Sequence, residues 1–145
     1  MGFIHCEITH EVLSPAKSWD LLQNNTQGAI IWFLGNVRDH NEGQKVTAIT
    51  YEGISVLGEN TLKKICEECH DKWGPDLDFV VVHRVGTLLV GETSIIIGVA
   101  SPHRVAAYES SRYIIEQIKL RLPIWKKEHY ASGKEAWLRG NSLNG

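Results

Sequence analysis

The sequence predicts an α+β fold with a mixed, mainly antiparallel sheet and one long helix in its C-terminal half. Strand-like and helix-like segments are interspersed along the 145 residues. The strand-like segments around Gly86 and Gly91 are joined by connections too short for a helical crossover, which favours antiparallel pairing. Between Ser101 and Leu122, apolar or small residues recur every three or four positions, as on one side of a helix.

The first third of the chain contains two predicted strands and a short helix. Alternating residues over Phe3–Thr9 predict a strand. Ser14 and Pro15 suit the N-cap and first turn of a helix over Ala16–Leu22. The continuous apolar run Gly28–Leu34 predicts a buried central strand.

The middle of the chain alternates in the same way. We expect a strand over Lys45–Glu52 and a helix over Glu59–Trp73, which a Gly-Pro pair ends. The β-branched segment Phe79–Val85 predicts a strand that continues, after a glycine, through Thr87–Val90. Thr93–Ala100 predicts another buried strand.

The long helix comes next. Ser101 suits its N-cap and Pro102 its first position, and Pro123 stops it because proline lacks an N–H group and clashes with the preceding turn. Glu135–Leu138 predicts a short edge strand, and we expect residues 140–145 to be frayed. We interpret residues 1–145 as a single domain, because this length is ordinary for one domain with its own core.

Composition excludes several functional classes. The formal net charge is −2, so no global basic field indicates nucleic-acid binding. No apolar run reaches 18 residues, so no membrane span is expected. The N-terminus lacks the pattern of a signal peptide, and three cysteines, an odd number, fit a reducing cytoplasm.

The cysteines resemble reactive sites only superficially. Cys66, Cys69 and His70 match the C-x-x-C-H form of haem attachment, but the two cysteines fall on an apolar helical stripe with Leu62. We therefore interpret them as small core residues. No second C-x-x-C pair could complete a zinc site, so we expect neither metal nor cofactor. Cys6, in a predicted strand, is a weak candidate for a nucleophile.

Cationic residues form three candidate sites. Arg38 follows a buried strand, where its guanidinium could bind a phosphate, or could simply be solvated. His103 and Arg104 lie in the first turn of the long helix, which favours an anion, although an exposed capping segment explains them equally well. Lys119 and Lys126 flank Pro-Ile-Trp, and a lysine near an apolar wall and other cations has a lowered pKa, although Lys126 and Lys127 could equally be a solvated surface pair. By contrast, we interpret the strand-end residue Arg84 as structural.

Several short segments together resemble the large, catalytic subunit of molybdopterin synthase. The similarity runs from about Gly28 to Trp137. The segments that carry it are Phe33–Asn41, Tyr51-Glu52, His83–Leu88, Val90–Glu92, Ser101–Arg104, Ile118-Lys119 and Pro123–Glu128.

This resemblance implies an α/β hammerhead-like fold and a reaction. The family converts cyclic pyranopterin monophosphate (precursor Z) to molybdopterin by adding two sulfur atoms. The sulfur arrives as a thiocarboxylate on the C-terminal glycine of a small ubiquitin-like subunit. The resemblance therefore implies a sulfurtransferase of molybdenum cofactor biosynthesis whose partner supplies the nucleophile.

The resemblance also implies functional residues. Lys119 and Lys126 match the catalytic lysines, with Lys119 placed against the incoming glycine and Lys126 serving proton transfer. The substrate-binding residues implied by the matching segments are Asn36, Val37, Arg38, His103, Arg104, Lys127 and Glu128. Arg139 lies near a tail arginine of the family, but the spacing after Trp125 is shifted by one residue, so we do not assign it.

The family forms a dimer of large subunits with two small subunits, a heterotetramer. This assembly explains a geometric conflict, because His103 and Lys119 would be about 24 Å apart on one straight helix. We therefore expect a composite pocket, with Lys119, Lys126 and Arg38 from one chain and His103 and Arg104 from the other.

Two other functions fit part of the pattern. A docking module could bind the carrier tail without reacting, although it would not need both Lys119 and Lys126. A generic phosphate-ester-binding domain would explain Arg38 and the pair His103-Arg104, but not the lysine cluster.

Overall fold

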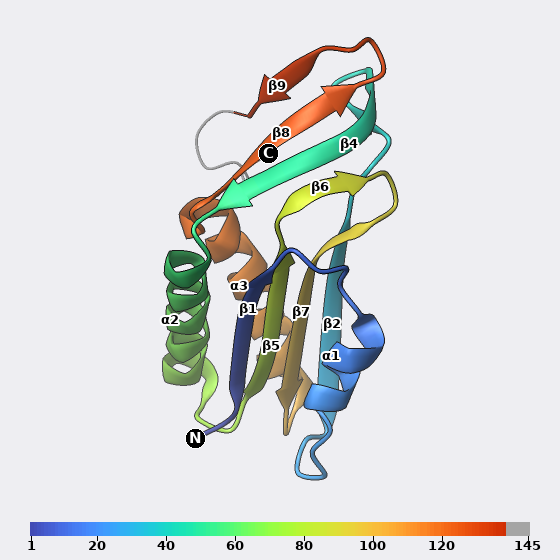
Figure 1. Cartoon of the computed structure of the whole chain (residues 1–145). Coiled ribbons are helices and arrows are strands. Elements are labelled where there is room, and N and C mark those ends of the chain that lie inside the picture. The colour runs from blue at the N-terminus through green and yellow to red at the C-terminus, as the bar shows by residue number, and fades with distance from the viewer. Residues whose placement is uncertain (139–145) are drawn as a thin grey trace.

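The computed structural model describes residues 1–138 and confirms the predicted α+β fold (Figure 1). Arg139, which we left unassigned, and residues 140–145, which we expected to be frayed, lie outside the described residues. The elements follow the chain as β1 (Ile4–Thr9), α1 (Pro15–Leu21), β2 (Ala29–Asn36), β3 (His40–Asn41), β4 (Gln44–Gly53), α2 (Ser55–Trp73), β5 (Asp78–Arg84), β6 (Gly86–Leu89), β7 (Thr93–Ser101), α3 (Arg104–Arg121), β8 (Ile124–Tyr130) and β9 (Glu135–Trp137).

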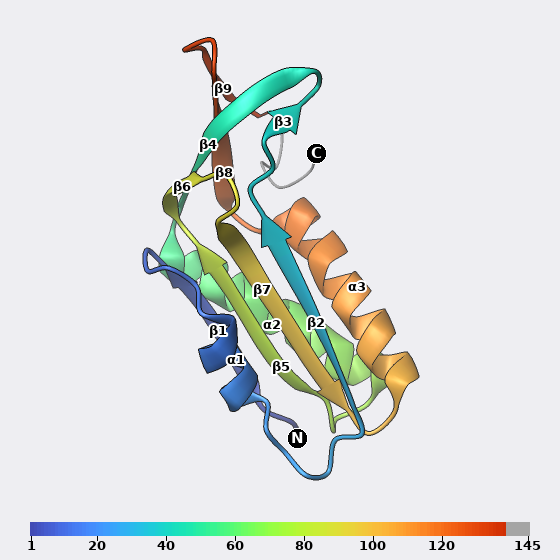
Figure 2. The same ribbon diagram turned by 90° about the vertical axis from the view of Figure 1, so that its right-hand side faces the viewer.

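The first sheet contains four strands in the order β1-β5-β7-β2. Strands β1 and β5 are parallel, and the other two pairs are antiparallel. Helices α2 and α3 cover one face and α1 covers the other (Figure 2). Phe79 and Val81 of β5 therefore belong to the core under α2 and α3, whereas Val80 and Val82 join the smaller core beside α1. Burial on both faces explains why this strand is apolar without alternation.

The second sheet is antiparallel and stands at one end of the first (Figure 1). Its order is β3-β4-β8-β9, and β6 also pairs with β4. We did not predict β8 from the sequence. Its residues IWKKEHY include two lysines and a glutamate, which are poor strand formers, so the strand depends on pairing with β4.

The start of the long helix differs from the prediction. Ser101 is the last residue of β7, and His103 is the N-cap of α3. The prediction that Ser101 caps this helix with Pro102 at its first position is therefore wrong. The Ser101 hydroxyl instead accepts a hydrogen bond from the His103 N–H (3.3 Å), so it caps the connecting turn. The same pattern at Ser14 is confirmed, because its hydroxyl accepts from the Lys17 N–H (3.2 Å).

The cysteines are confirmed as core residues. Cys66 and Cys69 are fully buried on α2. Burial raises the pKa of the Cys69 thiol to about 12, so it stays protonated. His70 donates from Nε2 to the Leu77 carbonyl oxygen (2.7 Å), which ties its ring to the backbone. No helix within residues 1–138 has the length and apolarity needed to span a membrane.

Candidate active site

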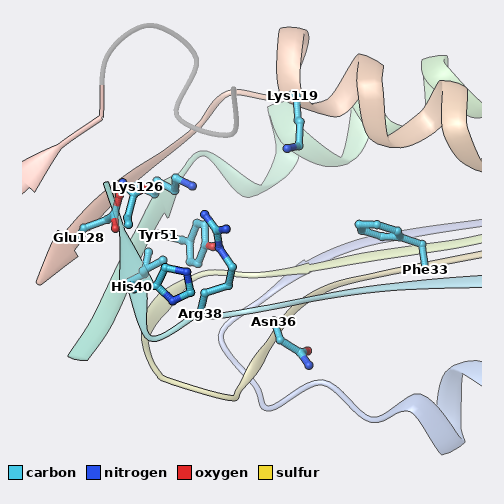
Figure 3. A pocket seen from close by; sticks show the side chains of 10 residues that line it. Phe33, Asn36, Arg38, His40, Tyr51, Lys119, Lys126 and Glu128 are labelled. Carbon is cyan, nitrogen blue, oxygen red and sulfur yellow. Dashed lines mark hydrogen bonds between the residues drawn. The ribbon is translucent and has the colours of Figure 1, made fainter. Parts of the chain in front are cut away.

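A pocket of about 480 Å³ opens where the two sheets meet the end of α3 (Figure 3). Three cations and one buried carboxylate point into it, supported by polar and aromatic side chains. The lining residues are Phe33, Asn36, Arg38, His40, Asn41, Ile49, Tyr51, Lys119, Lys126 and Glu128.

The end of β2 presents Asn36 and Arg38 to the pocket. The pairing of β2 with β7 shifts register between Gly35 and Asn36, so the chain leaves the sheet here. Val37 lies between the two lining residues but is buried, and its N–H donates to the Glu92 carbonyl oxygen (3.0 Å). Val37, which the resemblance implied as a substrate-binding residue, therefore anchors the turn and does not line the pocket.

Lys119 and Lys126 reach the pocket from consecutive elements. Lys119 is exposed in the last turn of α3. Pro123 then turns the chain into β8, where Tyr51 of β4 lies opposite Lys126 and Ile49 lies opposite Glu128. Because side chains alternate along a strand, Lys126 and Glu128 share the pocket face.

Lys127, between these two residues, faces the other way. Its ammonium lies 3.4 Å from the Glu135 carboxylate and 5.0 Å from the centre of the Trp137 ring. Both partners belong to β9, the edge strand that pairs with β8. The structure therefore does not bring Lys127 into this pocket, although the resemblance implied a substrate-binding role.

The electrostatics of the pocket lower the basicity of Lys126. Burial lowers the pKa of the Lys126 amine below its ordinary value. The Glu128 carboxylate opposes this shift, and the positive charges of Lys119 and Arg38 reinforce it. Lys126 therefore has more free amine near neutral pH than an exposed lysine, which suits a group that accepts a proton.

Glu128 is the negative centre of the site. Only 2% of its surface is exposed. One of its oxygens accepts a hydrogen bond from the Asn41 amide nitrogen (2.7 Å), which attaches β3 to β8. A carboxylate this deeply buried needs such partners, and the nearby cations supply further compensation.

His103 and Arg104 lie far from this pocket. They begin α3, whereas Lys119 lies near its end. At 1.5 Å per residue, the 16 positions between His103 and Lys119 correspond to roughly 24 Å. Both side chains are exposed. One chain therefore brings together five of the nine residues implied by the resemblance, namely Asn36, Arg38, Lys119, Lys126 and Glu128.

Other lining residues were not identified from the sequence as site residues. His40 and Asn41 form the two-residue strand β3, and Ile49 and Tyr51 come from β4. Only the long-range pairing of β4 with β8 brings the β4 residues to Lys126. Their signal in the sequence was indirect, because Asn41 and Tyr51 belong to segments that carried the resemblance.

The composition of the pocket favours an anionic ligand. Arg38, Lys119 and Lys126 outnumber the single carboxylate of Glu128, and a guanidinium with ammonium groups binds phosphate well. Within residues 1–138, no group of three or more His, Cys, Asp or Glu side chains is arranged to hold a metal ion. The arrangement can therefore bind a phosphate ester and move protons through an amine.

Comparison with known proteins identifies the family. Residues 8–121 match the model of the MoaE protein family. A molybdopterin synthase catalytic subunit from Synechococcus elongatus is 41% identical over 124 residues, covering 86% of this chain and 75% of the relative. The crystal structure of molybdopterin synthase from Staphylococcus aureus superimposes with a TM-score of 0.87 at 35% identity, covering 92% of this chain and 96% of that chain.

A more distant solved structure shares the fold. It is a complex of subunits 1 and 2 of molybdopterin-converting factor from Helicobacter pylori, matched with a TM-score of 0.74 at 20% identity over 96% of this chain and 92% of that chain. The family model covers most of the chain, and the relative from Synechococcus elongatus extends the similarity further. This chain therefore belongs to the MoaE family, the family of molybdopterin synthase catalytic subunits.

Proposed function

We propose that this protein converts cyclic pyranopterin monophosphate to molybdopterin, as the catalytic subunit of molybdopterin synthase. The pocket that combines Arg38, Lys119, Lys126 and Glu128 is the observation that carries this proposal. Its cations suit the phosphate of the substrate, and the lowered pKa of Lys126 suits proton transfer. The enzyme works in the cytoplasm, where its three free cysteines stay reduced.

The partner is a small ubiquitin-like subunit with a C-terminal thiocarboxylate. Lys119 is exposed at the pocket, so an incoming extended tail can reach it. Its ammonium would stabilise negative charge on the acyl group of the carrier glycine while sulfur is transferred. Lys126 exchanges protons with the substrate. Asn36, Arg38 and Glu128 hold the substrate in place.

A second copy of the chain completes the site. His103 and Arg104 cannot reach the pocket of their own chain, because the length of α3 separates them from Lys119. In a dimer they would add two groups that bind the substrate phosphate in the partner's pocket. Two large and two small subunits would then form the active heterotetramer.

Reconstitution tests the activity. The protein is mixed with a thiocarboxylated small subunit and precursor Z, and molybdopterin is followed by the fluorescence of its oxidised derivative. We expect product from the wild-type protein and a loss of about 10²–10³-fold in rate for Lys119→Ala, because one charge-stabilising group is removed. A complex that forms without any product would contradict the proposal and support the docking module.

Mixing two inactive variants tests the composite site. In a mixed dimer of a Lys119→Ala chain and an Arg104→Ala chain, both lesions would fall in the same pocket, so the other pocket would be intact. Random reassortment should restore about a quarter of the sites, since half of the dimers are mixed and half of their sites are intact. The control pairs Lys119→Ala with Lys126→Ala, which come from the same chain's pocket and leave each mixed dimer without an intact site. Equal activity of both mixtures would contradict the two-chain site.

A further inference from the structure

Tyr51 occupies an unusual position beside the pocket. Only 6% of its surface is exposed, yet it borders both the large pocket and an adjoining cavity of about 150 Å³. Lys126 also lines both cavities and lies directly opposite Tyr51 in the pairing of β4 with β8. The phenol and the amine therefore reach the same space from facing strands (Figure 3).

Two polar groups of the smaller cavity, His83 and Ser94, are poor proton donors. His83 is buried, and burial lowers its pKa to about 4, so its ring is neutral near pH 7. Its Nδ1 donates to the Arg84 carbonyl oxygen (2.7 Å), which leaves Nε2 without a proton. The Ser94 hydroxyl donates to the Gly35 carbonyl oxygen (3.1 Å).

Tyr51 itself keeps its proton. Burial raises the pKa of the phenol, which hydrogen bonding with Ser94 only partly offsets, and the negative charge of Glu128 raises the pKa further. The pKa of Lys126 is shifted in the opposite direction. In water the phenol is slightly more acidic than the amine, but these shifts favour a free amine beside an intact phenol. The two groups can therefore act as base and acid at the same time.

We propose that Tyr51 is a further catalytic residue, which donates a proton to an oxygen leaving the substrate while Lys126 accepts one. This inference rests on the proposed function, in which sulfur is bonded to carbon atoms that carried oxygen. When a carbon–oxygen bond breaks, its electron pair goes to oxygen, which then needs a proton. The Tyr51 O–H supplies this proton. The thiocarboxylate sulfur of the carrier, already an anion, forms the new carbon–sulfur bond as the carbon–oxygen bond breaks, which leaves a thioester to the carrier glycine. Water then hydrolyses this thioester and frees the carrier carboxylate. The Lys126 amine takes the proton that the water releases and returns it to the Tyr51 phenolate.

Tyr51→Phe tests the proposal, because it removes the hydroxyl and keeps the ring that contacts His83. The assay uses the reconstituted complex with precursor Z and compares kcat with KM. We expect kcat to fall by about 10²-fold or more, in the range of general acid catalysis, while KM stays within about threefold. Retention of more than about a third of kcat, or an effect on KM alone, would overturn the assignment.

Tyr113→Phe is the matched control. It also deletes a hydrogen-bonded phenol, in this case one that donates to Glu68 between α2 and α3, outside both cavities. This variant should keep the wild-type kcat. An inactive wild-type complex would refute the proposed function, whereas an active wild type with an active Tyr51→Phe variant would refute only this inference.

A second variant keeps the hydroxyl and so does not depend on the stability of Tyr51→Phe. Replacing Tyr51 with 3-fluorotyrosine preserves its shape and makes the phenol more acidic, because fluorine withdraws electrons. If the protonated phenol is required, the alkaline limb of the kcat profile should move to lower pH. An unmoved alkaline limb would overturn the proposal.

Discussion

The hydrogen bond between Asn41 and Glu128 should contribute measurably to stability. It is short (2.7 Å), and its acceptor is a carboxylate with 2% of its surface exposed. Hydrogen bonds to charged groups contribute about 1.5–3 kcal/mol. Because Asn41 is only half-buried, we expect a coupling free energy near the lower end, about 1.5 kcal/mol, in a double-mutant cycle of Asn41→Ala and Glu128→Ala.

Each single variant should lose more than the coupling term alone. Glu128→Ala leaves a cavity and an unpaired amide, so we expect a loss of about 3 kcal/mol in the free energy of unfolding. For a chain of this size, that loss corresponds to a decrease of about 6–12 °C in Tm. Glu128→Gln should be milder, because the amide oxygen can still accept from Asn41.

Urea unfolding followed by far-UV circular dichroism gives the four free energies of the cycle. The control is Glu135→Ala on the same sheet, where an exposed carboxylate pairs with Lys127 at 3.4 Å. An exposed ion pair contributes little, so this variant should change stability by less than about 1 kcal/mol. A coupling free energy below about 0.5 kcal/mol between Asn41 and Glu128 would show that this bond does not stabilise the sheet, and would refute the reasoning.

Two further predictions concern charge. Reductive 13C-methylation followed by NMR should show that the pKa of Lys126 is below that of an ordinary lysine. The variant Glu128→Gln should lower this pKa further, and Lys119→Met should raise it. A shift of the opposite sign in either variant would contradict the electrostatic model. Arg84→Ala should destabilise the protein by about 1–3 kcal/mol in urea unfolding, because it breaks a 2.8 Å ion pair with Glu92, in which the Arg84 side chain is only 13% exposed. An unchanged unfolding midpoint would show that the ion pair is dispensable.

Local signals in the sequence were sufficient for most of the fold. The β-branched run of β5 was recognised because buried strands need such side chains on both faces. The apolar run of β2 also predicted a strand, but the prediction that this strand is buried and central is wrong, because β2 is the edge strand of the first sheet and none of its residues is buried. The end of α3 was recognised because Pro123 cannot continue a helix. The start of α3 was misplaced by two residues, because Ser101 and Pro102 suit a connecting turn as well as a helix N-terminus.

Long-range pairing explains what the sequence left undetected. Nothing local to the lysine-rich segment of β8 favours a strand, and only its register with β4 forms one. The same pairing brings Tyr51 to Lys126, two residues far apart in the chain. Arg38, Lys119 and Lys126 could be nominated from charge and context, but Asn41 and Tyr51 could not, because their role depends on contacts that no sequence window contains.

The register of β8 determines which lysine can act as the base. Lys126 and Lys127 are adjacent and chemically identical, yet only Lys126 lines the pocket, where burial lowers the pKa of its amine. A slip of one residue would exchange the two faces, moving Lys127 inward and exposing Glu128. Ile124 and Glu128, both buried, oppose this slip, since it would place an apolar and a hydrogen-bonded side chain in solvent. The buried carboxylate therefore selects the reactive lysine through strand register as well as through its charge.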